Sequence, residues 1–160
     1  MKILSVQVER PVDTDPDLSY LGTYSNTPEE HHIDRKEHGW YKRNEYRYFN
    51  LGCGDPEYLE QDYKRMCDYN NSQWWMVGVQ AIAKVQFTDN GPSQSIKSGG
   101  LWGVESDSSK EYFAELEVEQ LMELRDELIA AGFDTNEVSE YTGDLILERV
   151  KDGTEIIPTV

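Results

Sequence analysis

The chain of 160 residues is poor in positive charge and in cysteine, and it has no long apolar segment. Its 15 Lys and Arg residues stand against 31 Asp and Glu residues, for a formal net charge of −16. Because phosphate affinity comes from Lys and Arg, this deficit argues against direct binding of nucleic acid and against docking on anionic membranes. No apolar run reaches the roughly 18 residues of a transmembrane helix. Hydrophobic residues make up 38% of the chain, which is enough for a folded core.

The chain also lacks the marks of exported, metal-binding and common catalytic proteins. Gln7 interrupts the first apolar stretch, so we expect no signal peptide and a cytoplasmic protein, in the host cytoplasm if a phage encodes it. Cys53 and Cys67 form no CxxC pair, so we expect reduced thiols. The aspartates of 13–17 lack the glycine and glutamate of a calcium loop, and the histidines lack zinc-ligand spacing. We expect no cofactor, no metal and no catalytic residues, and we favour a protein that binds over an enzyme.

Hydrophobic periodicity predicts both strands and helices. The clearest strand is 74–88, in which alternate residues are apolar over about 12 positions. Gly99 and Gly100 interrupt the next strand and indicate a bulge or a close backbone approach. Ser108 and Glu111 form a capping box at the start of the longest helix. The predicted strands are 2–9, 45–51, 74–88, 94–104, 144–150 and 154–159, and the predicted helices are 55–69 and 108–131.

These elements predict an α+β fold, with a mostly antiparallel sheet and two helices on one of its faces. The order is β-β-α-β-β-α-β-β, and its middle has the element order of a ferredoxin-like sandwich. Residues 1–160 are expected to form a single acidic domain. Residues 11–43 are rich in turn formers and predict a long irregular segment.

The second predicted helix separates apolar from acidic residues. Residues 105–148 hold 14 acidic residues and two basic ones, so they carry −12 of the net charge. Carboxylates four residues apart lie about 6 Å apart along a helix, and the row spans about 24 Å. Either this face keeps the protein dissolved, or it docks on a basic partner as a partial polyanion. The candidate partner-binding residues are Glu111, Glu115, Glu119, Glu123, Asp126 and Glu127.

Glu117 differs from these acids because it lies within the apolar stripe of the helix. A buried carboxylate needs a partner or it takes up a proton. Glu117 therefore pairs with an Arg or Tyr of the sheet, or reaches solvent beside it, or is a pocket acid with a raised pKa. The candidate pocket consists of Glu117, Trp102, Gly99 and Gly100.

Two further concentrations of residues stand out. Trp74, Trp75 and Trp102 are expected to converge near one end of the strand pair, as core or as an exposed contact patch. Basic and aromatic residues alternate within 35–48, which suits a nucleotide, a peptide groove or neutralisation by the acidic half of the chain. The basic residues there are Arg35, Lys36, Lys42, Arg43 and Arg47.

Four segments resemble a family of small acidic proteins carried by phages, prophages and plasmids, in which no activity is established. The resemblance covers most of the chain and implies no catalytic residues. Because mobile elements often carry small proteins that block defence machinery, it implies host-directed work of the anti-restriction or anti-CRISPR kind. The segments are DLSYLGTY (17–24), EQDYKRMCDYN (60–70), SGGLWGVESDS (98–108) and EQLMEL (119–124).

Three functions stay open. The first is a non-enzymatic acidic inhibitor, a nucleic-acid mimic that docks on a basic host protein such as a defence nuclease. The second is a ligand-binding or enzymatic domain with its pocket near Trp102 and Glu117. The third is a structural or assembly protein of a mobile element. A homodimer is compatible with each of them.

Overall fold

The computed structural model describes residues 1–38 and 41–152, and their contacts cluster into two compact units. Unit 1 consists of Met1–Thr14 together with Met76–Val160, and unit 2 is the insertion Asp15–Trp75. Both units combine helices with antiparallel strands, so the α+β class is confirmed. The sequence predicts a single domain because no Gly- or Ser-rich linker marks the borders of the insertion, whereas the contacts group the residues into two compact units. By sequence, unit 1 holds 19 acidic and 8 basic residues, and unit 2 holds 12 and 7.

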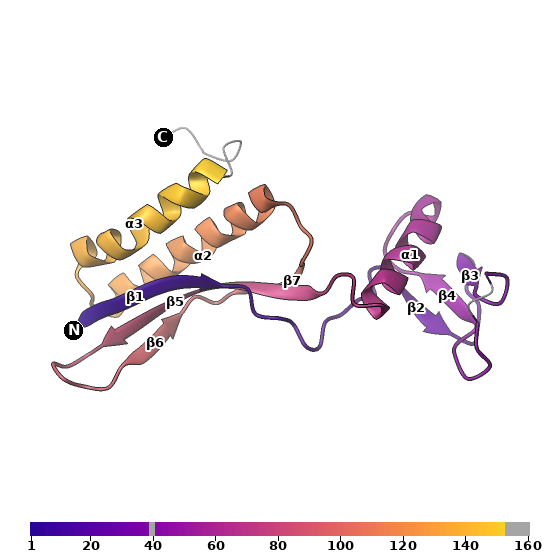
Figure 1. Cartoon of the computed structure of the whole chain (residues 1–160), viewed down its shortest axis with the longest axis horizontal. Helices are drawn as coiled ribbons and strands as arrows, with labels where there is room; N and C mark the ends of the chain where they lie inside the picture. Colours follow the sequence, from indigo (N-terminus) through magenta and orange to yellow (C-terminus); the bar gives the residue numbers. More distant parts are fainter. Residues whose placement is uncertain (39–40, 153–160) are drawn as a thin grey trace. The chain divides into compact units, whose positions relative to one another are not determined.

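The sheet of unit 1 is built around the long strand β5 (Met76–Gln86). Strand β1 (Lys2–Glu9) pairs with one edge of β5, and β6 (Gln94–Lys97) and β7 (Leu101–Glu105) pair in succession with the other (Figure 1). All these pairings are antiparallel. The predicted strands 2–9, 74–88 and 94–104 are therefore confirmed, and the last is broken at the two glycines as expected.

Two helices cover one face of this sheet (Figure 1). Helix α2 (Lys110–Ala130) packs on β5, and α3 (Thr135–Asp152) packs on α2 and on β1. The apolar residues of β5 that alternate toward the helices are buried, as their spacing predicts. The core of this layer contains Ile3, Ala81, Ala83, Val85, Leu121, Leu124, Leu128, Phe133 and Val138.

The ends of α2 differ in how well the sequence predicts them. Ser109 caps the N-terminus by accepting a hydrogen bond from the Tyr112 amide, whereas Ser108 donates its hydroxyl to the Glu105 carbonyl. The predicted capping box on Ser108 is thus wrong by one residue. Gly132 ends the helix with φ +98°, as expected for a glycine after a helix.

Helix α3 replaces the hairpin predicted over 144–150 and 154–159, so that prediction is wrong for the first strand; 154–159 lies outside the described residues. Asp134 begins the helix by accepting hydrogen bonds from the amides of Asn136 and Glu137. Val138 is buried, and Tyr141, Leu145 and Ile146 pack against the same core. Tertiary packing of this apolar stripe outweighs the β-propensity of the Leu-Ile-Leu run.

Unit 2 is a three-stranded sheet with one helix. Strands β2 (Gly22–Ser25) and β3 (His32–Asp34) flank β4 (Tyr48–Leu51). A short helix η1 (Pro56–Tyr58), capped by Asp55 as predicted, leads into α1 (Leu59–Asn70). The segment 11–43, predicted to be irregular, therefore contains two strands too short to show a period in the sequence.

The ferredoxin-like order is not observed. Helix α1 and strand β5, which should be successive parts of one sandwich, belong to different units, and α3 follows α2 without an intervening strand. Within the described residues, no helix combines the length and apolar character needed to cross a membrane.

Candidate functional site

The predicted acidic residues lie on the side of α2 that faces away from the core. Five of the six are exposed and Glu115 is half-buried. Among the described residues, none of the six forms an ion pair with a basic side chain. Lys110, at the start of the helix, pairs with Asp152 of α3 at 3.1 Å instead. We name this set the α2 acidic face: Glu111, Glu115, Glu119, Glu123, Asp126 and Glu127.

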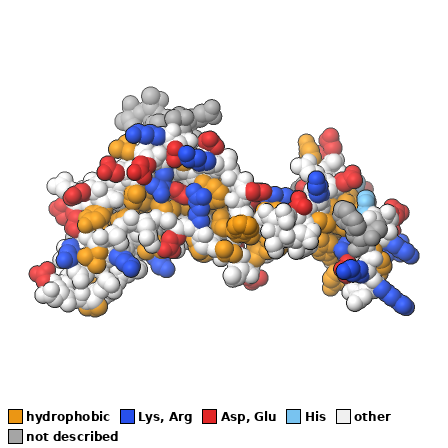
Figure 2. Space-filling view, in the orientation of Figure 1, with side chains coloured by type: hydrophobic (Ala, Val, Ile, Leu, Met, Phe, Trp, Pro, Cys, Tyr) orange, Lys and Arg blue, Asp and Glu red, His pale blue; other side chains and the backbone are white. Residues whose placement is uncertain are grey.

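Helix α3 adds carboxylates that sequence reasoning assigned to a strand. Glu140, Asp144 and Glu148 follow one another at intervals of four residues, and all three are exposed. In the view of Figure 2, acidic side chains lie over the helical layer of unit 1, with a few basic side chains among them. Polar residues spaced by four, as these carboxylates are, indicate a helix rather than a strand, so this spacing is the sequence signal for α3.

Gly99 and Gly100 anchor α2 to the sheet. The amide of Gly99 donates to Oε1 of Glu123 at 2.7 Å, and the amide of Gly100 donates to Oε1 of Gln120 at 2.9 Å. The same Gln120 oxygen accepts the hydroxyl of Ser98, and the three groups are buried or half-buried. Gly100 has φ +82°, a conformation that other residues rarely adopt. The two glycines are thus bound to α2 side chains other than Glu117.

Trp102 lies on the sheet face opposite to the helices. Its indole covers Gly78 of β5, where an added Cβ would meet the ring at 2.6 Å. A bulge in β7 makes this possible, because Gly103 has φ +76° and the register against β5 shifts there. About half of the Trp102 surface is exposed (50%). A Cβ on Gly100 would lie 3.3 Å from the Trp102 indole nitrogen, so Trp102 and the two glycines are neighbours, whereas Glu117 lies on α2 at the other face and does not join them.

The three tryptophans expected to converge are divided between the units: Trp74 and Trp75 belong to unit 2, and Trp102 belongs to unit 1. Trp74 belongs to unit 2, where it is buried under the guanidinium of Arg65, 3.9 Å from its ring centroid. Its indole nitrogen donates to the carbonyl of the same arginine at 2.9 Å. Trp74 is therefore core of unit 2, whereas Trp102 is a half-exposed side chain of unit 1.

Glu117 is buried and held by two arginines. Its Oε1 accepts from Arg10, which follows β1, and its Oε2 accepts from Arg149 of α3, both at 2.7 Å. The Arg10 guanidinium also lies 3.9 Å from the centroid of the Phe113 ring. The sequence predicts a pairing with an Arg or Tyr of the sheet; both partners are arginines, but Arg10 lies directly after β1 and Arg149 lies in α3. Since both carboxylate oxygens are occupied, this arrangement is that of a structural ion pair.

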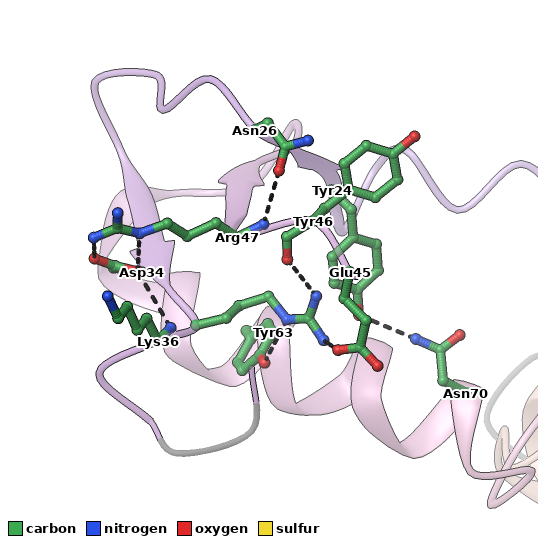
Figure 3. A network of polar contacts seen from close by, with 10 residues as sticks. Tyr24, Asn26, Asp34, Lys36, Glu45, Tyr46, Arg47, Tyr63 and Asn70 are labelled. Atoms are coloured by element: carbon green, nitrogen blue, oxygen red, sulfur yellow. Dashed lines mark hydrogen bonds and ion pairs between the residues drawn. The ribbon is translucent and has the colours of Figure 1, made fainter. Parts of the chain in front are cut away.

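Two of the basic residues of the run, Arg35 and Arg47, belong to a polar network within unit 2, part of which Figure 3 shows. Arg47 binds both carboxylate oxygens of Asp34, at 3.0 and 2.8 Å, and these bonds hold the pKa of Asp34 below its ordinary value. Arg35 donates to Oε2 of Glu45 at 2.9 Å and to the hydroxyl of Tyr63 at 3.2 Å. Two of the five basic residues are thus neutralised by acids of their own unit, and these acids do not belong to the acidic half of the chain.

Cys53 and Cys67 are both free thiols, as expected. Across residues 1–38 and 41–152, no three His, Cys, Asp or Glu side chains lie close enough together to hold a metal ion. Comparison with known proteins adds no relative: no family model, no curated protein and no solved structure matches the chain.

Proposed function

We propose that the protein is a non-enzymatic acidic binding protein whose α2 acidic face occupies a basic, nucleic-acid-binding surface of another protein. The observation that carries the proposal is the row of carboxylates on α2 that is exposed to solvent and has no basic ion-pair partner among the described residues. A carboxylate that its own chain leaves unneutralised is available to the cations of a partner.

The geometry of the row suits such a partner. Successive carboxylates stand about 6 Å apart and cover about 24 Å, at a lower charge density than the phosphates of a duplex. A groove built for nucleic acid presents Lys and Arg at comparable spacings. The resulting attraction accelerates association and weakens as salt is added.

The row of like charges also lowers the stability of the helix, and a binding function would offset this cost. Like charges four residues apart destabilise a helix by a few tenths of a kcal/mol each. Glu115 and Glu119 stand four residues apart and within about 40° of each other around the helix, so their charges act at about 6 Å, whereas Asp126 lies about 10 Å further along the axis. Together with the resemblance to proteins of mobile elements, this favours a host defence nuclease or its recognition complex as the partner.

The test uses charge reversal on α2 with a matched reversal on α3. The triple variant Glu115→Lys, Glu119→Lys, Asp126→Lys changes the centre of the α2 acidic face and spares Glu123, which binds Gly99. The control Glu140→Lys, Asp144→Lys, Glu148→Lys makes the same change of charge on α3. Each variant and the wild-type protein are used to capture proteins from a host lysate at low and high salt, with and without duplex DNA as competitor.

The expected result is a captured protein that salt and duplex DNA both release, that the α3 variant retains and that the α2 variant loses. If the α2 variant still captures the protein, the proposal is contradicted. It is also contradicted if duplex DNA does not displace the captured protein. Equal loss in both variants assigns the effect to total charge and contradicts the role of the α2 face.

A further inference from the structure

Unit 2 contains a hollow that the proposed function does not use. Its volume is about 670 Å³, and it is lined by residues of β2, of the segments around Arg35 and Lys42, and of α1. Pockets that hold small ligands measure about 300–1,000 Å³. The hollow is therefore large enough for a molecule of the size of a nucleotide.

One wall of the hollow is formed by Arg35, whose guanidinium is held by two side-chain hydrogen-bond partners and one aromatic ring. The Arg35 guanidinium donates to Tyr63 and Glu45 and lies 4.9 Å from the centroid of the Tyr24 ring. Its side chain is only 13% exposed. A side chain held by this many contacts is ordered before any ligand arrives, so binding against it loses little entropy.

The rim carries two cations that the unit does not neutralise. Lys42 and Lys64 both line the hollow and are exposed, and neither has an ion-pair partner among the described residues. The lining contains two acids, Glu45 and Asp68, and Glu45 is already bound to Arg35. Within a unit that has 12 acidic and 7 basic residues, this is a local excess of positive charge.

Tyr24 adds a hydrogen-bond donor and a ring face. Its hydroxyl accepts from Nδ2 of Asn70 at 3.0 Å, which leaves its own proton free to donate. Burial raises the pKa of Tyr24 to about 12, so the hydroxyl keeps this proton at neutral pH. The ring is half-buried, in contact with the Arg35 guanidinium and with Phe49, and part of its remaining surface lines the hollow.

We propose that this hollow binds a small anion that carries an aromatic ring, of the class of nucleoside monophosphates, with its phosphate at Lys42 and Lys64 and its ring against Tyr24. A longer nucleic acid fits less well, because the acidic residues of the rest of unit 2 repel the flanking phosphates. The proposed nucleotide site and the α2 acidic face lie in different units, so an experiment that contradicts one of the two proposals leaves the other untouched.

The test is calorimetric titration of the full chain with AMP and UMP, compared with adenosine and with ribose 5-phosphate. The double variant Lys42→Gln, Lys64→Gln is expected to weaken binding of the nucleotides by about tenfold. The matched control Lys36→Gln removes an exposed lysine of the same unit that does not line the hollow, and it is expected to bind like the wild-type protein.

Adenosine and ribose 5-phosphate are each expected to bind at least about tenfold more weakly than AMP, since each lacks one of the two recognised groups. Three results overturn the proposal: no nucleotide binding up to about 1 mM, unchanged affinity in the double variant, or ribose 5-phosphate binding as tightly as AMP. A single-stranded oligonucleotide that binds more tightly than AMP overturns the assignment to a small ligand.

Discussion

Glu117 of α2 and Arg149 of α3 are joined by a 2.7 Å hydrogen bond between Oε2 and Nε inside the helical layer of unit 1. The second oxygen of the same carboxylate binds Arg10, directly after β1. One buried acid therefore ties together a strand end and both helices. Arg149 also donates to the carbonyl of Leu145, which fixes its side chain along α3.

Replacing Glu117 by Gln is expected to destabilise unit 1. The amide removes the negative charge that Arg10 and Arg149 share, and it leaves Arg149, whose side chain is only 20% exposed, without a counter-charge in a largely buried setting. Because Arg10 is about half exposed (47%), part of its loss is recovered by water, and we expect a cost of about 2 kcal/mol. Urea unfolding followed by circular dichroism measures this change.

The matched control for this substitution is Glu119→Gln, which removes the same charge from the same helix at an exposed position. We expect its free energy of unfolding to stay within about 0.5 kcal/mol of the wild-type value. If the two variants are equally stable, the double ion pair contributes nothing and the assignment of Glu117 as a structural residue is wrong.

Neutral substitutions on the α2 acidic face are expected to stabilise the protein. In the double variant Glu115→Gln, Glu119→Gln the repulsion between neighbouring carboxylates is removed, for a gain of about 0.5 kcal/mol at low salt. Added salt screens the same repulsion in the wild-type protein, so the difference should shrink as ionic strength rises. Thermal unfolding at low and high salt tests this, and a double variant that is less stable at low salt contradicts it.

The parts of the fold that the sequence predicts well are those whose signal is local. In strand β5 every second residue from Val77 to Val85 is apolar, and the break between β6 and β7 is marked by Gly99 and Gly100. The exposed acids and the buried Glu117 follow from one helical wheel of α2. In each case the residues that determine the structure are neighbours in the chain.

The parts that the sequence predicts poorly depend on distant partners. Strands β2 and β3 are four and three residues long, and only their pairing with β4 defines them. Residues 144–150 have strand-forming side chains, and α3 forms because Leu145 and Ile146 complete a core begun by Val138. With this segment assigned to a hairpin, Arg149 could not be recognised as a partner of Glu117.

Raising the pH above about 10 is expected to destabilise unit 2 through Tyr24. Burial raises its pKa in the folded state to about 12, whereas an unfolded tyrosine ionises near pH 10. The folded state therefore holds the proton more tightly, and its contribution to stability is complete below about pH 10 and is lost as the pH rises toward 12. Free energies of unfolding at about pH 9 and about pH 11 show this loss in the wild-type protein.

Tyr24→Phe removes the ionising group, so this variant should lose less stability over the same interval. Tyr58→Phe is the matched control, because it removes one phenol hydroxyl from an exposed ring of the same unit. It is expected to follow the wild-type protein. A fall in stability that is equal in all three proteins shows that groups other than Tyr24 cause the alkaline transition.

Because the chain forms two compact units, we predict that a substitution that destabilises unit 2 leaves the stability of unit 1 unchanged. A Cβ on Gly52 would lie 2.3 Å from the carbonyl oxygen of Ser19 and 2.4 Å from that of Tyr20, so Gly52→Ala forces the backbone apart at a cost of about 2 kcal/mol. In hydrogen exchange followed by mass spectrometry, peptides covering β4 should exchange faster in this variant, and peptides covering β5 should be unchanged. Gly54→Ala is the matched control, because its Cβ meets only the movable carboxylate of Asp62, at 2.8 Å. Faster exchange in both units of Gly52→Ala would show that the two unfold as one cooperative body, since a local clash can spread only through shared stability.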